Sequence, residues 1–169
     1  MAADTTDFRI RGARKGDAPV IMQLIRDLAE YEKLAHEVVA TELDIDTQLF
    51  GAHPHAEALL AEFQDEPVGF ALFFHNFSTF LGRPGLYLED LFVKPDYRGR
   101  GFGKQLLATL ARIAVERGCG RFEWAVLDWN TPAIRFYESL GAKIISEWKI
   151  NRVTGDALNE LAKLAELPD

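Results

Sequence analysis

The spacing of apolar and polar residues along the N-terminal third of the chain predicts one strand and two helices. Residues 8–13 alternate apolar and charged side chains, which is typical of a short strand. Four apolar residues between Ile21 and Leu28 recur at helical spacing, so we expect a helix with one buried stripe and with Asp17 as its cap. Residues 41–50 predict a second, shorter helix.

Longer apolar runs in the middle of the chain predict strands. Residues 56–63 and 66–78 are separated by a short polar break, which indicates a hairpin whose second strand is long and rich in Phe. A mostly apolar strand is expected at 85–93. Continuous apolar runs are typical of strands that are covered on both faces.

The C-terminal half alternates predicted helices and strands. A helix is expected over 103–117, a strand over 121–127, and a helix over 130–142, capped by Asn130 or Thr131 and closed by Gly141. One or two strands over 143–153 and a terminal helix over 155–167 follow. The pattern predicts a mixed α/β class with six to seven strands in a central sheet, and residues 1–169 are expected to form a single domain.

Composition and charge exclude several classes of protein. The net charge of −7 argues against a nucleic-acid-binding protein, which usually carries a basic face, and it is compatible with a cationic small substrate. No stretch approaches the ~20 apolar residues of a membrane span, and the first residues lack the features of a secretory signal. Cys119 is the only cysteine, so we expect no internal disulfide and a cytoplasmic location. His53 and His55 lack further ligands at suitable spacing, so no metal is expected.

The stretch "PDYRGRGFGK" (95–104) places three glycines on alternate positions between an apolar strand and a helix. Its spacing does not match the dinucleotide fingerprint or the ATPase phosphate loop. Glycines let a ligand approach the backbone, a helix N-terminus offers free N–H groups, and basic side chains add charge. We therefore expect a pyrophosphate cradle rather than a plain turn with a basic edge. Its residues are Arg98, Gly99, Arg100, Gly101, Phe102, Gly103 and Lys104.

The stretch "LYLEDLFVKPDYRGRGFGKQLL", followed by "NTPAIRFYESLGA", resembles the GCN5-related N-acetyltransferases (GNAT). With "LIRDLAEYEKL", "FGAHPHAEALLAE" and "AVLDWN", the chain is similar to the diamine branch, which includes spermidine/spermine and thialysine N-acetyltransferases. The resemblance runs from about Phe8 to Lys163. It implies a GNAT fold with a bulged strand that opens the acetyl-CoA site, and acetyl-CoA as cosubstrate.

The resemblance also implies roles for residues outside the glycine loop. Main-chain atoms of Leu91, Phe92 and Val93 would hold the acyl and pantetheine part of acetyl-CoA, and Asn130 and Ala133 match further positions that contact it. Glu138 and Ser139 depart from the branch, which often carries a basic residue after the preceding tyrosine.

Acetyl transfer needs a neutral amine and a protonated leaving thiolate. An alkyl amine with a pKa near 10.4 is neutral in only about one molecule in 10³ at pH 7. The resemblance assigns Glu89 as the base, acting through water, and Tyr137 as the general acid. Asp90 would secure the structure or the substrate. Neighbouring residues of a regular strand face opposite sides, so Glu89 and Asp90 are not expected to share one role.

Residues matching the substrate side of the branch are mostly acidic or aromatic. They are Tyr31, Glu32, Asp90, Glu123, Trp124, Ala125 and Glu147. Acids along a channel suit an extended cation. Ser78 and Thr79 are uncharged where the spermidine-type enzymes carry an acid, which favours a lysine-like amino acid or short diamine.

Two alternatives remain at this stage. The same chemistry could act on a peptide or protein amine, or the chain could be a non-catalytic CoA-binding regulatory module. The related enzymes are homodimers, and "EWKINRV" resembles the segment between their subunits, so a homodimer is expected, with no nucleic-acid or membrane partner.

Overall fold

The computed structural model describes residues 7–166, and contacts within it divide the chain into two compact units, 1–125 and 126–169. Each unit is described by itself. Residues 1–6, which make up most of the N-terminal stretch considered above for a secretory signal, lie outside the described residues. Leu167, the last residue of the predicted terminal helix, also lies outside them.

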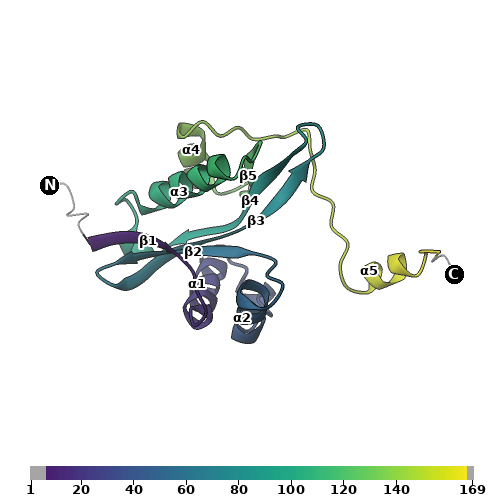
Figure 1. The fold of residues 1–169 in the computed structure, drawn as a ribbon, viewed down its shortest axis with the longest axis horizontal. Helices are drawn as coiled ribbons and strands as arrows, with labels where there is room; N and C mark the ends of the chain where they lie inside the picture. The colour runs from purple at the N-terminus through teal and green to yellow at the C-terminus, as the bar shows by residue number, and fades with distance from the viewer. Residues whose placement is uncertain (1–6, 167–169) are drawn as a thin grey trace. The chain divides into compact units, whose positions relative to one another are not determined.

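The first unit is built on one mixed sheet in the order β1-β2-β3-β4-β5 (Figure 1). Its strands are β1 (Phe8–Gly12), β2 (Glu57–Phe63), β3 (Glu66–Ser78), β4 (Arg83–Val93) and β5 (Phe122–Trp124). The first four pair antiparallel, and β5 pairs parallel to β4. The α/β class is confirmed, but the sheet of the described residues has five strands rather than six or seven.

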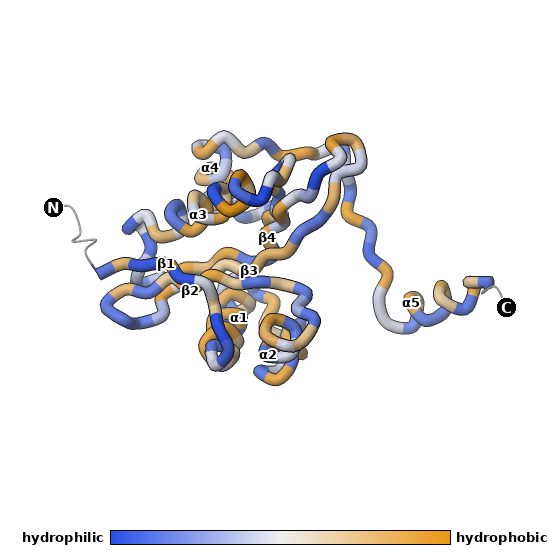
Figure 2. The backbone as a smooth tube through the Cα atoms, viewed as in Figure 1, coloured by the Kyte–Doolittle hydropathy of each residue, from blue (hydrophilic) through white to orange (hydrophobic). Residues whose placement is uncertain are grey.

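Helices cover both faces of this sheet. α1 (Ala18–Tyr31) and α2 (Glu42–Phe50) lie on one face and α3 (Phe102–Glu116) on the other, with short 3₁₀ turns at Ala35–Glu37 and Pro95–Tyr97 (Figure 1). The apolar stripe of α1 packs on Phe70 and Phe92 of the central strands. Double coverage explains the long apolar runs of β2, β3 and β4, which contribute much of the orange in Figure 2.

Local sequence signals explain the start of α2 and the turn between β2 and β3. Thr41 caps α2 in a reciprocal capping box with Asp44. Gln64 and Asp65 adopt left-handed conformations (φ 52° and 63°), as a two-residue hairpin turn between twisted strands requires.

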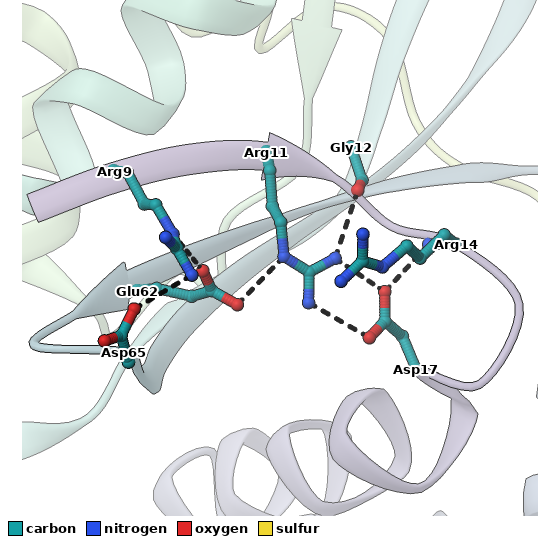
Figure 3. Close-up of polar contacts among 7 residues, drawn as sticks. All are labelled: Arg9, Arg11, Gly12, Arg14, Asp17, Glu62 and Asp65. Carbon is teal, nitrogen blue, oxygen red and sulfur yellow. Dashed lines mark hydrogen bonds and ion pairs between the residues drawn. The ribbon is translucent and has the colours of Figure 1, made fainter.

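Asp17 does not cap α1 as predicted. It occupies the cap position, but its carboxylate accepts hydrogen bonds from the Arg11 side chain and from the N–H of Arg14 instead of from the helix. Figure 3 shows the resulting ion-pair chain, in which Arg11 also donates to Glu62 of β2 (2.9 Å) and Arg9 donates to the same carboxylate. These ion pairs join β1, β2 and the start of α1.

The second unit contains α4 (Thr131–Ser139) and α5 (Gly155–Ala162). The Asn130 side chain caps α4 by accepting from the N–H of Ala133, and Gly141 follows the helix with φ 92°, as predicted.

The strands predicted at 143–153 do not form, and the strand predicted at 121–127 is shortened to Phe122–Trp124. A strand needs a neighbouring edge to satisfy its N–H and C=O groups. The described part of the second unit has no strand that could pair with 143–153.

Candidate active site

A β-bulge at Glu89 interrupts β4 at the predicted acidic pair. Asp90 lies opposite Leu72 of β3, whereas Leu88 lies opposite the next residue, Phe73, so Glu89 has no partner in the register. A bulge inserts one residue and changes which face the following side chains occupy. Asp90 consequently shares the α1 face with Leu72, and Glu89 is exposed at the bulge.

Beyond the bulge, no strand of residues 7–166 pairs with the outer edge of β4. β5 pairs with β4 only over Leu86–Leu88. The N–H of Lys94 donates to Val68 of β3 (2.8 Å), and alternate residues of an antiparallel strand direct their main-chain groups to opposite edges. The main-chain groups of Leu91 and Val93 therefore lie on the open edge, and those of Phe92 lie toward β3.

Three carboxylates gather where α1 ends and β4 bulges. Burial raises the pKa of Asp90 to about 7, and the nearby charges of Glu89 and Glu32 add to this rise. Burial also raises the pKa of Glu32, the residue directly after α1. This acidic cluster, Glu32, Glu89 and Asp90, can attract a cation, since one ammonium would relieve the repulsion between its members.

Glu123 of β5 is already held by basic and amide groups. Its carboxylate lies 2.7 Å from Nε of Arg121 and accepts a hydrogen bond from Asn76. Tyr87 lies opposite Glu123, and its pKa is raised by burial, with smaller contributions from the charges of Glu89 and Glu123. Trp124 packs near Phe122 (ring centroids 4.9 Å apart), and Ala125 follows the strand, exposed.

The glycine loop leads from the end of β4 into α3. Gly99 and Gly101 have φ of 74° and 83°, a conformation that other residues rarely adopt, and a Cβ at either position would meet no atom within 4 Å. Gly103 has no such strain, and a Cβ there would only touch Val93 (3.9 Å). The open space above the loop fits a ligand that approaches the backbone closely.

The first turn of α3 adds hydrogen-bond donors to this loop. The helix begins with a bond from the N–H of Gln105 to Gly101, so the N–H groups of the preceding residues have no acceptor within the helix. Lys104 is exposed there. Phe102 is buried and stacks on Phe8 (4.0 Å between centroids), so only its main chain can contact a ligand.

The two arginines beside Gly99 contact aromatic rings on different elements. The Arg98 guanidinium lies 4.4 Å from the ring centroid of Tyr31, and its Nε donates to the carbonyl of Val93 (2.9 Å). The Arg100 guanidinium lies 5.4 Å from the ring centroids of both Phe63 and Tyr97. From the sequence, both arginines were expected to neutralise the charge of a bound pyrophosphate. Their contacts with aromatic rings were not expected, because no local sequence pattern indicates them.

The second unit carries the remaining predicted residues. Tyr137 is half-buried on α4 beside Phe136 (5.5 Å between centroids), and Asn130 and Ala133 form the cap of the same helix. Glu147 is exposed in the stretch that follows.

Two classes of feature are absent from the described residues. Within 7–166 there is no group of three or more His, Cys, Asp and Glu side chains placed to hold a metal ion. In the same range, no helix has the length and apolar character needed to cross a bilayer.

Comparisons with known proteins agree on one family. A family model described as "Acetyltransferase (GNAT) family" matches residues 21–142. Thialysine N-epsilon-acetyltransferase of Sus scrofa is 41% identical, with 90% of this chain and 96% of that protein covered. L-ornithine N5-acetyltransferase of Arabidopsis thaliana is 36% identical, with 92% and 88% covered. Among solved structures, an integron cassette protein of V. cholerae is 31% identical, with a TM-score of 0.79 and coverage of 93% of this chain and 98% of that one.

Proposed function

The chain belongs to the acetyltransferase (GNAT) family, and from this membership we propose that it transfers the acetyl group of acetyl-CoA directly to the primary amine of a small cationic substrate. The observation that carries the proposal is the bulge in β4. It places an exposed carboxylate, a half-buried carboxylate and an open main-chain edge within one stretch, 89–93.

The acyl donor would be held mainly by main-chain groups. The N–H and C=O groups of Leu91 and the N–H of Val93 suit the amide-rich pantetheine arm, and the free N–H groups at the start of α3 suit a pyrophosphate. Arg100 and Lys104 add positive charge. Phe92, Asn130 and Ala133 complete the proposed contacts, the last two on the resemblance to the family.

Acetyl-CoA supplies an activated acetyl group as a thioester. The reaction forms a bond between the amine nitrogen and the acetyl carbonyl carbon and breaks the carbon–sulfur bond. Glu89 accepts the amine proton through water. This proton transfer offsets the free-energy cost of about 4–5 kcal/mol for converting an alkyl ammonium to the neutral amine at pH 7. Tyr137 donates a proton to the departing sulfur.

The amine substrate is a lysine-like amino acid or a short diamine. Its ammonium binds the acidic cluster, with Tyr31, Glu123, Trp124, Ala125 and Glu147 as further substrate-side residues. The relatives named for thialysine and ornithine support an amino-acid substrate. Ser78 is buried, and its hydroxyl accepts from the N–H of Leu81, so it offers no charge to a second ammonium.

We also propose that the chain acts as a homodimer and as a single domain over 1–169. The stretch 143–153 exposes Ile144, Ile145, Trp148, Ile150 and Val153, which supports a partner for this segment. The single cysteine is compatible with a cytoplasmic location.

Glu89→Gln and Tyr137→Phe separate catalysis from mere CoA binding. Each is expected to lower kcat by about 10²–10⁴-fold and to leave the Kd of CoA within about threefold. CoA binding by a parent protein that shows no turnover would support a regulatory module instead.

A further inference from the structure

Two opposite charges, Arg121 and Glu123, lie side by side on β5, next to the strand that carries the bulge. Arg121 directly precedes β5 and Glu123 lies within it, and Nε of Arg121 is 2.7 Å from the Glu123 carboxylate. Residues two positions apart on a strand face the same side of the sheet. The two side chains are 41% and 40% exposed, so a ligand can reach both members of this β5 charge pair from solvent.

The β5 charge pair faces the same side of the sheet as Asp90. The partners of Asp90 and Tyr87 on β3 are two positions apart and therefore share a face. Glu123 lies beside Tyr87 in the parallel register of β4 and β5. Burial raises the pKa of Tyr87, and the charges of Glu89 and Glu123 raise it further, so Tyr87 lies close to both the bulge and the charge pair.

The separation between Asp90 and Glu123 suits the length of a lysine-like molecule. Two positions along β3 correspond to about 7 Å, and one step to the neighbouring strand adds ~4.8 Å at a right angle, so the two Cα atoms are about 8 Å apart. The two nitrogens of an extended lysine are joined by six bonds of ~1.5 Å, which span about 7–8 Å as a zigzag chain. One such molecule can place its side-chain nitrogen at the acidic cluster and its α-carbon at the charge pair.

Asn76 and Gly85 hold Glu123 in place. The side-chain amide of Asn76, on β3, donates a hydrogen bond to the Glu123 carboxylate on β5 (3.3 Å) and therefore reaches across β4. Gly85 of β4 lies opposite Asn76, and a Cβ at Gly85 would clash with the amide oxygen of Asn76. A glycine at this position therefore makes room for the contact. The carboxylate is oriented before a substrate binds, which lowers the entropic cost of binding.

The positive charge of Arg121 distinguishes amino acids from diamines. Nε of Arg121 faces Glu123, and within residues 7–166 the guanidinium forms no other ion pair or side-chain hydrogen bond, so its two terminal NH₂ groups remain as donors. Such groups match the two oxygens of a carboxylate. The α-carbon of an amino acid carries a carboxylate and an ammonium, which complement Arg121 and Glu123. The second ammonium of a diamine would be repelled by the guanidinium instead.

We propose that the β5 charge pair is the subsite for the α-carbon of an amino-acid substrate, in which Arg121 binds the α-carboxylate and Glu123 the α-ammonium. The inference deepens the proposed function and rests on it, because it takes the acidic cluster as the site of the reacting amine. It narrows the substrate from small cationic amines to α-amino acids. No role was predicted for Arg121 from the sequence, because its position beside Tyr87 depends on the register of β4 and β5.

The test compares lysine with 1,5-diaminopentane (cadaverine), which lacks only the α-carboxylate, by calorimetry on CoA-saturated protein. We expect wild-type protein to bind lysine at least about tenfold more tightly than cadaverine, since only lysine can make the bidentate contact. Arg121→Gln is expected to raise the lysine Kd about tenfold and to lower the cadaverine Kd by up to about threefold, because the repelling charge is removed. Cadaverine binding by the variant also shows that it is folded.

Arg112→Gln is the matched control, because it removes the same charge from the exposed surface of α3, where Arg112 lies 3.8 Å from Glu116. It is expected to leave the lysine Kd within about twofold of wild type. Arg121→Lys keeps the charge but not the planar fork, so its lysine Kd is expected to lie between those of wild type and Arg121→Gln. An equal loss of lysine binding in Arg112→Gln and Arg121→Gln would indicate an effect of net charge and overturn the inference.

The inference is also overturned if wild-type protein binds no lysine, if it binds cadaverine as tightly as lysine, or if Arg121→Gln weakens both ligands equally. Lysine binding that depends on Arg121, without thiol release from acetyl-CoA, would contradict the proposed function and leave the carboxylate subsite standing. Thiol release with equal kcat/KM for lysine and cadaverine, unchanged in Arg121→Gln, would do the opposite.

Discussion

Asp90 lies opposite Leu72 in the register of β3 and β4, on the sheet face that α1 covers, while its neighbour Glu89 has no partner. A single inserted residue therefore separates the two acids into different surroundings. Asp90 is half-buried beside Glu32, and Glu89 is exposed at the bulge. In the proposed function, Asp90 binds the ammonium and Glu89 accepts its proton, which requires the two acids to lie in different surroundings.

Asp90 should make amine binding depend on pH near neutrality. Its pKa of about 7 means that it becomes charged as the pH rises from 6 to 8, while the amine stays protonated throughout this range. The Kd of thialysine on CoA-saturated protein should fall as the pH rises through 7, measured by calorimetry. Asp90→Asn should bind more weakly at pH 8 and lose this dependence. An unchanged pH dependence in the variant would contradict the assignment.

The glycines of the loop should differ in their tolerance of alanine. Gly101→Ala should lower the free energy of unfolding by about 1–2 kcal/mol, because an alanine is strained at φ 83°. Gly103→Ala is the matched control, and it should be neutral or stabilising by up to about 1 kcal/mol, since Gly103 lies within α3 and its added methyl only touches Val93. Urea denaturation measures both values. Equal losses would show that the left-handed conformation is not required.

Glu62 should stabilise the fold in a pH-dependent way. Burial alone would raise its pKa, but the hydrogen bonds from Arg9 and Arg11 hold the pKa below its usual range. Because this pKa is lower in the folded protein, Glu62 adds stability at pH values above its pKa in the unfolded chain. That stability is lost as the pH falls through its pKa in the folded protein. Glu62→Gln should therefore cost about 1–3 kcal/mol at pH 7 and less below pH ~4.

The exposed neighbour Asp65 provides the control for this network. It pairs with Arg9 at 3.1 Å but is 85% exposed, so Asp65→Asn should change the free energy of unfolding by less than about 0.5 kcal/mol. A similar loss in both variants would indicate that overall charge, rather than the buried carboxylate in Figure 3, is responsible.

Local patterns predicted most of the fold of the first unit. The apolar stripe of α1, the hairpin turn at Gln64 and Asp65, and the glycine loop each follow from short-range spacing, and all are present in the structure. The α4 cap at Asn130 follows from the same kind of signal. The predicted strands at 143–153 are absent, because apolar spacing indicates only that a segment could pair and not that an edge is available to it.

The sequence supplied a set of candidate site residues but not their arrangement. An apolar run cannot indicate which of its residues is the inserted one. A bulge in this strand was expected only from family resemblance, which placed it just after Glu89 and Asp90, whereas the structure places it at Glu89. The contacts of Arg98 with Tyr31 and of Glu62 with Arg9 join residues that are 67 and 53 positions apart. Such pairings depend on the topology of the sheet, which no sequence window contains.

Thiol release from acetyl-CoA is the decisive measurement of acetyl transfer by this protein, with thialysine, lysine, ornithine, putrescine and spermidine compared as acceptors. We expect turnover, with kcat/KM highest for thialysine or another amino acid, because the site carries one acidic cluster and no acid at Ser78. The absence of thiol release with all five acceptors would contradict the proposal that the protein is an N-acetyltransferase acting on small amines. Preference for spermidine would contradict the inferred substrate class and leave the acetyl transfer itself in place.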